Sequence, residues 1–574
     1  MLMKKRFAAI FLALVVSAFS LTGCTKSAET SSSAEDQSSY VLSEDADSTS
    51  VAADEYFAEG DLRDVESEEA NAVITLSGSA GELSDTTRGS SGSDVTITSK
   101  GIYEITGSSE NVTITVNDSN KSGNVYLVLN GVSMNNSDDP CIVVEQSEKV
   151  IIVCKGDNNT LRYTNASNTD GLDGAVYSED DITLTGSGKL SVESAKHGIV
   201  CKDDFKLTGS ETSVSAAGVG VKASDSARIG SGALEIKSDH DGIQVENKKG
   251  DSFFYMSGGA VKVSAGYDGI DTGTSSADFT GSAMLLGGTL DITSGGGSDN
   301  SKDDETSQKG IKCDGDITLG GVALSVSSAD DAVNSKGNVT VSTGADLLLS
   351  TSDDGLTATG ELTINDGALT IDKSYEGIEG ASVTINGGAV SVTSSDDGIN
   401  AGGGSDSASD EEFSEESSGS VTINGGSVYV NSTGDGIDSN GSVYVTDGTL
   451  IIEGPTDAGN GAIDKGDASG CTASITGGTV LAIGSSGMAI NFDSGSQCSA
   501  LVSLSGSEGT EIAVNDGSEF TFTASKSFDC VVYSSPDLKQ GSFYKLTAGS
   551  SSADIDFTSS IYYSDVQTRG GMQP

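Results

Sequence analysis

Residues 376–399 read EGIEGASVTINGGAVSVTSSDDGI, and this stretch holds one complete repeat of the chain and the start of the next. Each repeat opens with a phrase made of an acidic residue, a glycine and an aliphatic residue. Clear copies open at Asp241, Asp268, Asp354, Glu376, Asp397 and Asp435, and weaker copies open at His197 and Asp331. A fixed period of roughly 22 residues is typical of a solenoid, in which each coil buries its apolar face against its neighbours.

Two runs of alternating residues follow the phrase within each repeat. In residues 383–385 (VTI) and 390–392 (VSV) the apolar residues would point inward and the polar residues outward. The Gly387-Gly388 step between the two runs supplies a corner, where positive φ is easiest for glycine. The aliphatic residue of the phrase supplies a third inward wall. The sequence therefore predicts an all-β fold: a right-handed parallel β-helix of about 22 residues and three short strands per coil, with the handedness of parallel β crossovers.

The segments outside the repeats predict the rest of the organisation. Residues 1–23 carry a basic start and an apolar run, and they precede Cys24 as a lipoprotein signal would; an ordinary secretory signal that happens to contain a cysteine is the alternative. Residues 24–71 are rich in serine and acidic residues and predict a disordered tether. The β-helix repeats are expected over residues 173–499, with acidic insertions near 295–309 and 402–419. Residues 72–172 and 500–564 are expected to cap the two ends, and residues 565–574 to form a loose tail.

The charge balance narrows the choice of partners. The chain has 31 basic and 85 acidic residues, a net charge of −54, two histidines and no tryptophan. Such a surface repels nucleic acid, because phosphate backbones need lysine and arginine contacts, and it favours cations. Seven cysteines follow Cys24, an odd number that does not indicate a disulfide framework, although Cys498 and Cys530 could pair.

Acidic residues recur at the first position of successive coils and would stack about 4.8 Å apart, the spacing of neighbouring strands. Two carboxylates at that distance repel by about 1 kcal/mol in water and by several times more at a partly dehydrated surface. Oxygen ligands in a flexible arrangement suit Ca²⁺. The alternative is that each aspartate caps a turn by bonding to its own backbone. The predicted calcium ligands are Asp241, Asp268, Asp271, Asp330, Asp331, Asp353, Asp354, Glu376, Glu379, Asp396, Asp397, Asp435 and Asp438.

Two further patterns are candidates for sugar contacts. Outward threonines recur on the first strand of consecutive coils, at Thr340, Thr363, Thr384 and Thr422. Ordinary β-propensity on a solvent face is the favoured explanation of such a column. Tyr267 and Tyr375 each precede an acidic first position, where a sugar ring could stack beside a metal.

The residues before and within the repeats carry a family resemblance. Residues 74–76 (ITL), 95–98 (VTIT), 101–107 (GIYEITG) and 127–132 (LVLNGV), followed by the Asp-Gly-Ile coils, resemble the clostridial carbohydrate-binding β-helix proteins. The resemblance covers nearly all of the chain after the tether. It implies a pectate-lyase-like β-helix with bound calcium that attaches to cellulose and acidic plant polysaccharides without cleaving them.

These observations together predict a cell-surface lipoprotein that binds polysaccharide, either an acidic glycan such as polygalacturonate or cellulose, through a calcium-loaded β-helix. We expect a monomer, held outside the cytoplasmic membrane by the lipid on Cys24 alone. A structural spacer or adhesin stalk without a sugar ligand is the second hypothesis. A divergent calcium-dependent polysaccharide lyase is the third; its candidate bases, Arg228, Lys312 and Lys373, form no visible cluster in the sequence.

Overall fold

A computed structural model describes residues 54–167, 171–273, 278–402, 419–518 and 520–564. Their secondary structure consists of strands β1 to β47, and these residues contain no α-helix. The all-β prediction is confirmed. None of them lies in a helix long and apolar enough to span a bilayer.

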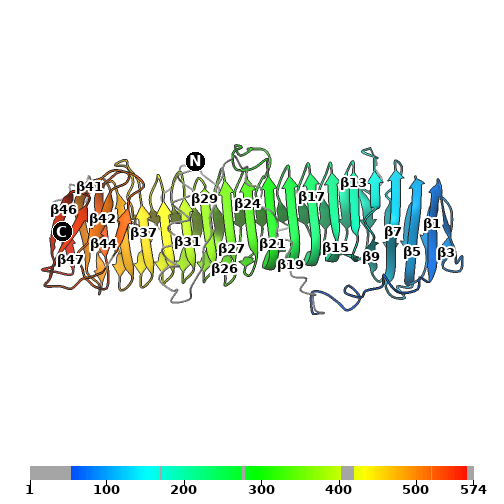
Figure 1. Cartoon of the computed structure of the whole chain (residues 1–574), viewed down its shortest axis with the longest axis horizontal. Helices are drawn as coiled ribbons and strands as arrows, with labels where there is room; N and C mark the ends of the chain where they lie inside the picture. Colours follow the sequence, from blue (N-terminus) through cyan, green and yellow to red (C-terminus); the bar gives the residue numbers. More distant parts are fainter. Residues whose placement is uncertain (1–53, 168–170, 274–277, 403–418, 519, 565–574) are drawn as a thin grey trace, which may run out of the picture. The chain divides into compact units, whose positions relative to one another are not determined.

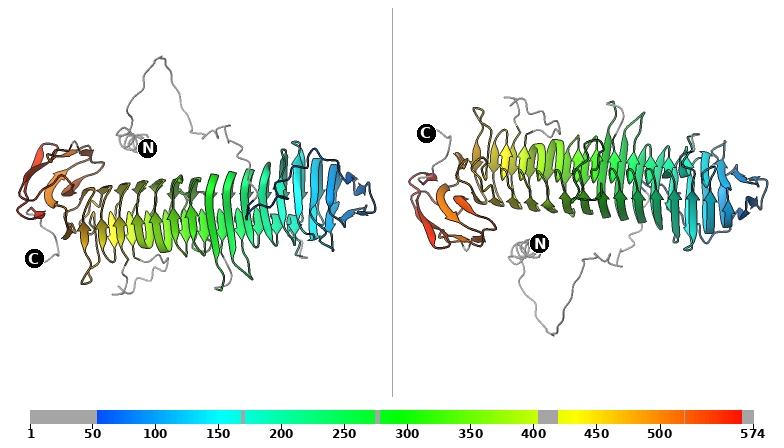
Figure 2. Two further views of the ribbon diagram at one scale, coloured as in Figure 1. Left: turned by 90° about the horizontal axis from the view of Figure 1, so that it is seen from below. Right: turned by 90° about the horizontal axis from the view of Figure 1, so that it is seen from above.

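Most strands pair in parallel with the strand one repeat later in the chain, so the repeats stack as coils (Figures 1 and 2). Residues 378–380 in β30 (Ile378–Ile385) pair with β32 (Ile399–Ala401), and Val383 in the same strand lies opposite Val421 of β33 (Val421–Ile423). β29 (Ala368–Lys373) pairs with β31 (Ala389–Thr393). Each coil therefore contributes to three parallel stacks of strands.

Long strands bend from one stack into another. Stack 1 contains β1 (Ala72–Gly78), β5 (Gly101–Glu110), β7 (Val125–Asn136), β9 (Val150–Lys155), β12 (Ile182–Thr185), β15 (Asp204–Ala216), β17 (Ser226–Ser238), β19 (Ser252–Ala265), β21 (Gly281–Ser294), β23 (Ile317–Leu319), β26 (Val339–Val341), the second part of β28 (Leu356–Ile364) and of β30, β33, β36 (Val443–Val445), β38 (Ala473–Ile475) and β40 (Ser494–Gly495).

Stack 2 contains the second parts of β7, β15, β17, β19 and β21, with β10 (Asn159–Tyr163), β13 (Lys189–Ser194), β24 (Ala323–Ser328), β27 (Asp346–Thr351), β29, β31, β34 (Ser427–Asn431), β37 (Thr449–Glu453) and β39 (Thr479–Gly484). Stack 3 contains β4 (Asp94–Ile97), β6 (Thr113–Asn117), β8 (Ile142–Gln146), β11 (Gly174–Ser178), β14 (His197–Cys201), β16 (Val221–Ala223), β18 (Ile243–Val245), β20 (Ile270–Thr272), β22 (Ile311–Cys313), β25 (Val333–Ser335), the first parts of β28 and β30, β32 and β35 (Ile437–Ser439).

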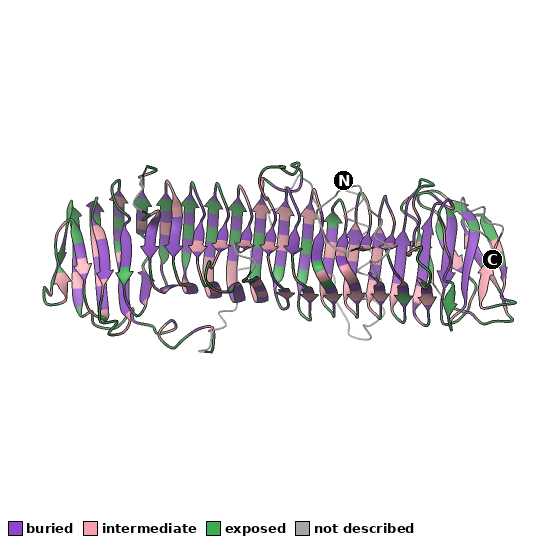
Figure 3. Cartoon of the chain, turned by 180° about the vertical axis from the view of Figure 1, so that it is seen from behind, coloured by how far each residue is buried: buried purple, intermediate pink, exposed green. Residues whose placement is uncertain are grey.

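The core lies between the three stacks, and buried residues alternate with more exposed ones along most strands (Figure 3). Val383, Ile385, Val390 and Val392 are all buried, as the alternation predicts. Two positions of the repeat require glycine for steric reasons. A Cβ on Gly377 would lie 2.3 Å from the carbonyl oxygen of Gly398 on the next coil, and Gly388 holds a corner at φ 85°.

Both ends of the stacks are closed by antiparallel strands. At the start, β2 (Ala80–Leu83) pairs with β1, and β3 (Gly89–Ser90) pairs with β4. At the other end, β44 (Phe528–Ser534) lies antiparallel to β39 and to β41 (Ser499–Gly506), which also pairs with β47 (Ile561–Tyr563). A separate sheet of β42 (Glu511–Val514), β43 (Thr521–Thr523), β45 (Phe543–Ala548) and β46 (Ser551–Asp556) covers a second apolar cluster there. The parallel pairing itself already begins at β1, within the region expected to form a cap.

The prediction of a disordered tether over residues 24–71 is wrong for residues 54–71. Phe57, Asp61 and Val65 are buried against the coils, because the segment packs on an apolar outer face described below. Residues 24–53, the predicted signal over 1–23, the lipidation site Cys24 and the predicted tail over 565–574 lie outside the described residues. The cysteines after Cys24 are all free, including Cys498 and Cys530.

Candidate functional site

The acidic first positions of the repeats form a column where the chain passes from stack 2 into stack 3. The amide of Gly355 donates to the carbonyl of Glu376 at 3.0 Å, and the amide of Gly377 donates to the carbonyl of Asp397 at 2.9 Å. The same bond repeats from coil to coil. We call these positions the first column: Asp241, Asp268, Lys309, Asp331, Asp354, Glu376, Asp397 and Asp435.

Carboxylates of the first column tie each coil to the next. The Oδ1 atom of Asp354 accepts the amide of Glu376 at 3.1 Å, and the Oδ1 atom of Asp397 accepts the amide of Asp435 at 2.6 Å. Asp331 receives the amide of Asp354 in the same way, at 3.3 Å. Turn capping therefore operates between coils, whereas the capping alternative placed the bond within the residue's own turn. This bond uses one lone pair and leaves the other carboxylate oxygen available.

A second column runs in register three residues further along each coil. Its members are Gln244, Asp271, Lys312, Asn334, Thr357, Glu379, Asn400 and Asp438. Several second-column amides donate to the first column: the Nδ2 atom of Asn334 to Asp331 at 2.7 Å, and that of Asn400 to Glu376 at 2.9 Å. The structure thus brings the predicted ligands of both columns together along one edge.

Lysines neutralise the N-terminal part of this edge. Lys309 lies in the first column and its Nζ atom pairs with Asp330 at 3.0 Å and with Asp331. Lys312, in the second column, pairs with Asp268 at 3.2 Å and with Asp271 at 3.6 Å.

A third lysine reaches the same part of the edge from the predicted insertion at 295–309. Lys302 contacts Asp353 at 2.5 Å and Asp330 at 3.4 Å. Lys312, which belongs to no visible basic cluster in the sequence, therefore lies with Lys302 and Lys309 beside the acidic column. The sequence did not reveal this arrangement because these lysines are far from their aspartates in the chain and are brought to them by the coil register.

The C-terminal part of the edge brings carboxylates close together. Asp397, Asp435 and Asp438 each offer an oxygen within 4.8 Å of the others. Burial, followed by the charges of neighbouring carboxylates, raises the pKa of Asp397 and of Asp435 to about 7 and that of Asp438 to about 6. A cluster whose carboxyls hold protons this strongly lacks a compensating cation among its described neighbours.

Glu376 lies one coil before Asp397 and Asp354 one coil before Glu376, and both show the same effect more strongly. Burial first, and then Asp331 and other acidic neighbours, raise the pKa of Asp354 to about 9; burial also raises that of Glu376 to about 8. The Oγ1 atom of Thr357, in the second column, is buried without a hydrogen-bond partner in the part of the chain that the structure describes. Such an orphaned oxygen fits a position lined by oxygen donors for a cation or a water molecule.

One further predicted ligand, Asp241, and the two predicted tyrosines have separate surroundings. Asp241 is buried, its pKa is raised to about 7 by burial and by Asp268, and its Oδ2 atom accepts a bond from Gln244 at 3.0 Å. Tyr375 is 48% exposed, and its bond to Asp396 raises its pKa to about 12. Tyr267 stacks on His240 with ring centroids 4.7 Å apart, so one of its faces is already covered. The second predicted insertion, at 402–419, lies almost wholly outside the described residues.

The threonine column stands in register on the outward face of stack 1. Thr340 lies opposite Thr363, Thr363 opposite Thr384, and Thr384 opposite Thr422. The structure extends this column by Thr318 at one end and by Tyr444, which is 38% exposed, at the other. Thr318 was missed because its coil opens with Lys309 instead of an acidic residue. The threonine face and the acidic edge lie on different parts of each coil.

The comparison with family models decides the family. The model of the carbohydrate-binding domain-containing protein family matches residues 91–355 and 353–517, which is more than half of the chain. The chain belongs to this family. The resemblance found in the sequence is thereby confirmed.

Two proteins are similar to parts of this chain. A carbohydrate-binding domain-containing protein of Acetivibrio thermocellus is 35% identical over 130 residues, which cover 21% of this chain and 45% of that protein. The chain thus spans less than half the length of that curated relative. A solved structure, the gadolinium derivative of a polysaccharide lyase-like protein from C. thermocellum, is similar with a TM-score of 0.37 and 24% identity, over 49% of this chain and 100% of that one.

Proposed function

We propose that this protein attaches to polysaccharide through calcium held at Asp397, Asp435 and Asp438. Membership of a carbohydrate-binding family supports polysaccharide as the ligand class. The observation that carries the calcium proposal is the approach of these three carboxylates to within 4.8 Å of one another. Carboxylates this close are stable as a charged set only when a cation or protons compensate them.

The donor set fits calcium. Oxygen-only ligands in a flexible arrangement suit Ca²⁺, and both columns offer carboxylate oxygens. When bound, the ion would supply positive charge to which carboxylates of an acidic glycan can bind. The protein residues would hold the ion and keep neighbouring coils in register through the bonds of the first column. Without the ion, the same acidic edge would repel a polyanion.

The first test is calorimetric titration of the metal-stripped full chain with Ca²⁺, repeated with polygalacturonate present. Calcium uptake that strengthens glycan binding is the expected result. Uptake of calcium with no change in glycan binding would overturn the bridging role, and no uptake would reduce the acidic edge to the coil-to-coil bonds described above.

Two rival functions are separated by simple assays. A spacer or adhesin stalk would retain no glycan with or without calcium. A calcium-dependent lyase would release unsaturated uronides that absorb in the ultraviolet; the carboxylate cluster at Asp397, Asp435 and Asp438 has no described lysine or arginine in an ion pair with it, and a lyase needs a base beside the metal. We therefore favour binding.

The remaining parts of the proposal concern architecture and location. Three parallel stacks with a period of about 22 residues fit a parallel β-helix, and the usual crossover rule makes it right-handed. We propose that the lipid on Cys24 anchors a monomer at the cell surface, outside the cytoplasmic membrane. Labelling with a radioactive fatty acid, compared between the natural chain and Cys24→Ala, tests the anchor.

A further inference from the structure

The described residues before β1 form a strap across the outer face of stack 1. The strap, residues 54–70, contains no strand, and its backbone bonds are internal turns, such as the Asp61 amide to the Ala58 carbonyl at 2.9 Å. It is held to the coils by side chains and by single carbonyls rather than by a strand ladder. It can therefore leave without breaking any sheet pairing.

One end of the strap covers an apolar patch. Val65 packs in a cluster with outward residues of β5, β7 and β9, namely Ile102, Tyr126, Val128, Ile151 and Val153. Arg63 lies over the ring of Tyr126 at 5.3 Å. This end also makes polar contacts: the carbonyl of Glu66 accepts a bond from the Nζ atom of Lys155 at 3.0 Å, and its carboxylate accepts one from the Oγ atom of Ser187 at 2.7 Å.

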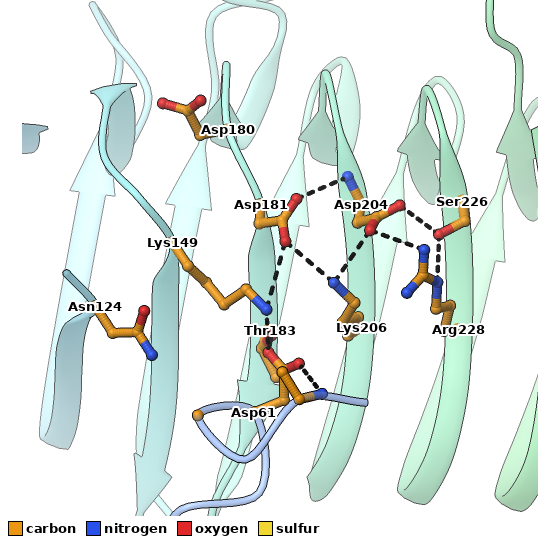
Figure 4. Close-up of polar contacts among 12 residues, drawn as sticks. Asp61, Asn124, Lys149, Asp180, Asp181, Thr183, Asp204, Lys206, Ser226 and Arg228 are labelled. Carbon is orange, nitrogen blue, oxygen red and sulfur yellow. Dashed lines mark hydrogen bonds and ion pairs between the residues drawn. The ribbon is translucent and has the colours of Figure 1, made fainter. Parts of the chain in front are cut away.

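The middle of the strap inserts a carboxylate beside Lys149, in a network of lysine, arginine and aspartate side chains (Figure 4). Asp61 is fully buried; it accepts a bond from the Nζ atom of Lys149 at 2.8 Å and from the Oγ1 atom of Thr183 at 2.6 Å. Lys206 and Arg228 lie on the following coils. Lys206 pairs with Asp181 and Asp204, and Arg228 pairs with Asp204.

Withdrawal of the strap removes Asp61 from this network, whereas Asp181, Asp203 and Asp204 on the coils stay within 4.8 Å of one another. Lys149, Lys206 and Arg228 face Asp181, Asp204 and Asp61, and all six take part in ion pairs. Withdrawal of Asp61 leaves Lys149, whose side chain is 12% exposed, with Asp181 alone at 3.4 Å. The vacated position would be a carboxylate site with an ammonium group and a hydroxyl already positioned.

The far end of the strap stacks an aromatic ring on the same face. Tyr56 lies parallel to Tyr255, with ring centroids 3.9 Å apart and planes at 9°. The carbonyl of Tyr56 accepts a bond from the Nη1 atom of Arg228 at 2.9 Å. Tyr255 is 6% exposed beneath the strap, and withdrawal of Tyr56 would free a flat ring face on which a pyranose ring could stack.

These residues belong to the same outward line as the threonine column. In register along stack 1 the line runs through Thr183, Lys206, Arg228, Tyr255, Met284, Thr318 and Thr340. The strap covers the first part of the line, and no described segment covers the threonines. A chain lying along the axis, as the strap does, would pass from one part to the other.

We propose that the strap occupies subsites for an acidic polysaccharide, with Asp61 in the place of a uronate carboxylate and Tyr56 in the place of a sugar ring. A glycan chain that lies on the threonine column displaces the strap and extends onto Lys149, Arg228 and Tyr255. The strap is thus a competing internal ligand, which lowers the apparent affinity until it is displaced. This inference rests on the proposed polysaccharide function and gives it a second, calcium-independent site.

The test measures binding of galacturonate oligomers to the full chain in the presence of a chelator, which removes the contribution of the acidic edge. Asp61→Asn removes the carboxylate that Lys149 pairs with while keeping the side-chain shape. We expect the Kd of this variant to fall about tenfold relative to the natural chain, because a weakened competitor raises the fraction of open sites. Glu59→Gln removes one charge from an exposed position of the same strap and should leave the Kd within about twofold.

Two further measurements fix the interpretation. The double variant Asp61→Asn with Lys149→Met removes both charges of the Asp61–Lys149 pair. It should lose the increase in affinity that Asp61→Asn alone gives. Hydrogen exchange of residues 54–70 in the natural chain should increase when oligomers bind. Unchanged binding by Asp61→Asn, or a strap that stays protected in the complex, would overturn the inference and make the strap a fixed cover. If the natural chain shows no calcium-dependent glycan binding, the proposed function is refuted. The difference in Kd between Asp61→Asn and the natural chain, measured in chelator, would still test the strap.

Discussion

The acidic edge consists of two regions with the same sequence phrase and different chemistry. From Asp268 to Asp353, lysines at 302, 309 and 312 pair with the aspartates. From Asp354 to Asp438, carboxylates face one another and burial raises their pKa values, up to about 9 for Asp354. A repeated motif therefore guarantees a position in the coil but not a charge state. The charge state depends on which residues the coil register and the insertions bring beside it.

The largest expected effect comes from breaking the lysine-paired region. Lys309→Met leaves Asp330 and Asp331 buried, at 2% and 0% exposure, without their shared ammonium partner. We expect a loss of about 3–5 kcal/mol in the free energy of unfolding, the usual cost of breaking a buried ion pair from one side. Chemical denaturation at neutral pH measures it.

The matched control is Lys302→Met, which removes a lysine that is 38% exposed from Asp330 and Asp353. An exposed pair contributes less than about 1 kcal/mol, so this variant should remain close to the natural chain. Equal losses in the two variants would show that burial does not separate them.

The second prediction exchanges carboxylate for amide in each region. Asp438→Asn should weaken calcium binding at least about tenfold, because it removes one of three clustered charges. Asp271→Asn, at the same register in the lysine-paired region, should leave calcium binding unchanged, because Lys312 lies 3.6 Å from its carboxylate. Calorimetry on both variants makes the comparison, and equal losses of affinity would place the ion elsewhere.

The third prediction concerns pH. Asp354, Glu376, Asp397 and Asp435 have native pKa values of about 9, 8, 7 and 7, whereas the unfolded chain has values of about 4. The native state therefore binds more protons than the unfolded chain between pH 4 and these native pKa values. The contribution of these groups to stability is full below pH 4 and is lost as the pH rises from 4 to about 9. Melting temperature in a chelator should drop over this range. Calcium should restore it at pH 8 and have little effect at pH 5, where protons already neutralise the cluster.

Much of the architecture could be predicted because period and alternation are local properties of the sequence. The register of Thr340 with Thr363 and the inward positions of Val383 and Ile385 follow directly from the repeat. The strap was missed although a signal existed. Residues 125–129 (VYLVL) and 150–153 (VIIV) are continuous apolar runs, as expected for strands buried on both faces, and the cover needed for the outer face is Val65. The pairing of lysines with the acidic edge could not be predicted, because Lys302 and Lys309 belong to the insertion at 295–309, whose path the sequence does not determine.

The smallest expected effect on stability belongs to the threonine column, the uncovered continuation of the line beneath the strap. Thr363→Val keeps the shape and the β-propensity of the side chain and should change the free energy of unfolding by less than about 0.5 kcal/mol. If a glycan lies along the column, Thr363→Val together with Thr384→Val should weaken its binding severalfold, because two hydroxyl contacts are lost at neighbouring coils. The same pair of substitutions should weaken binding to Asp61→Asn by a similar factor, since one chain would contact both parts of the line. Affinity electrophoresis in polygalacturonate gels compares the four proteins, and a threonine effect that vanishes when the strap is loosened would mean that the two parts hold separate ligands.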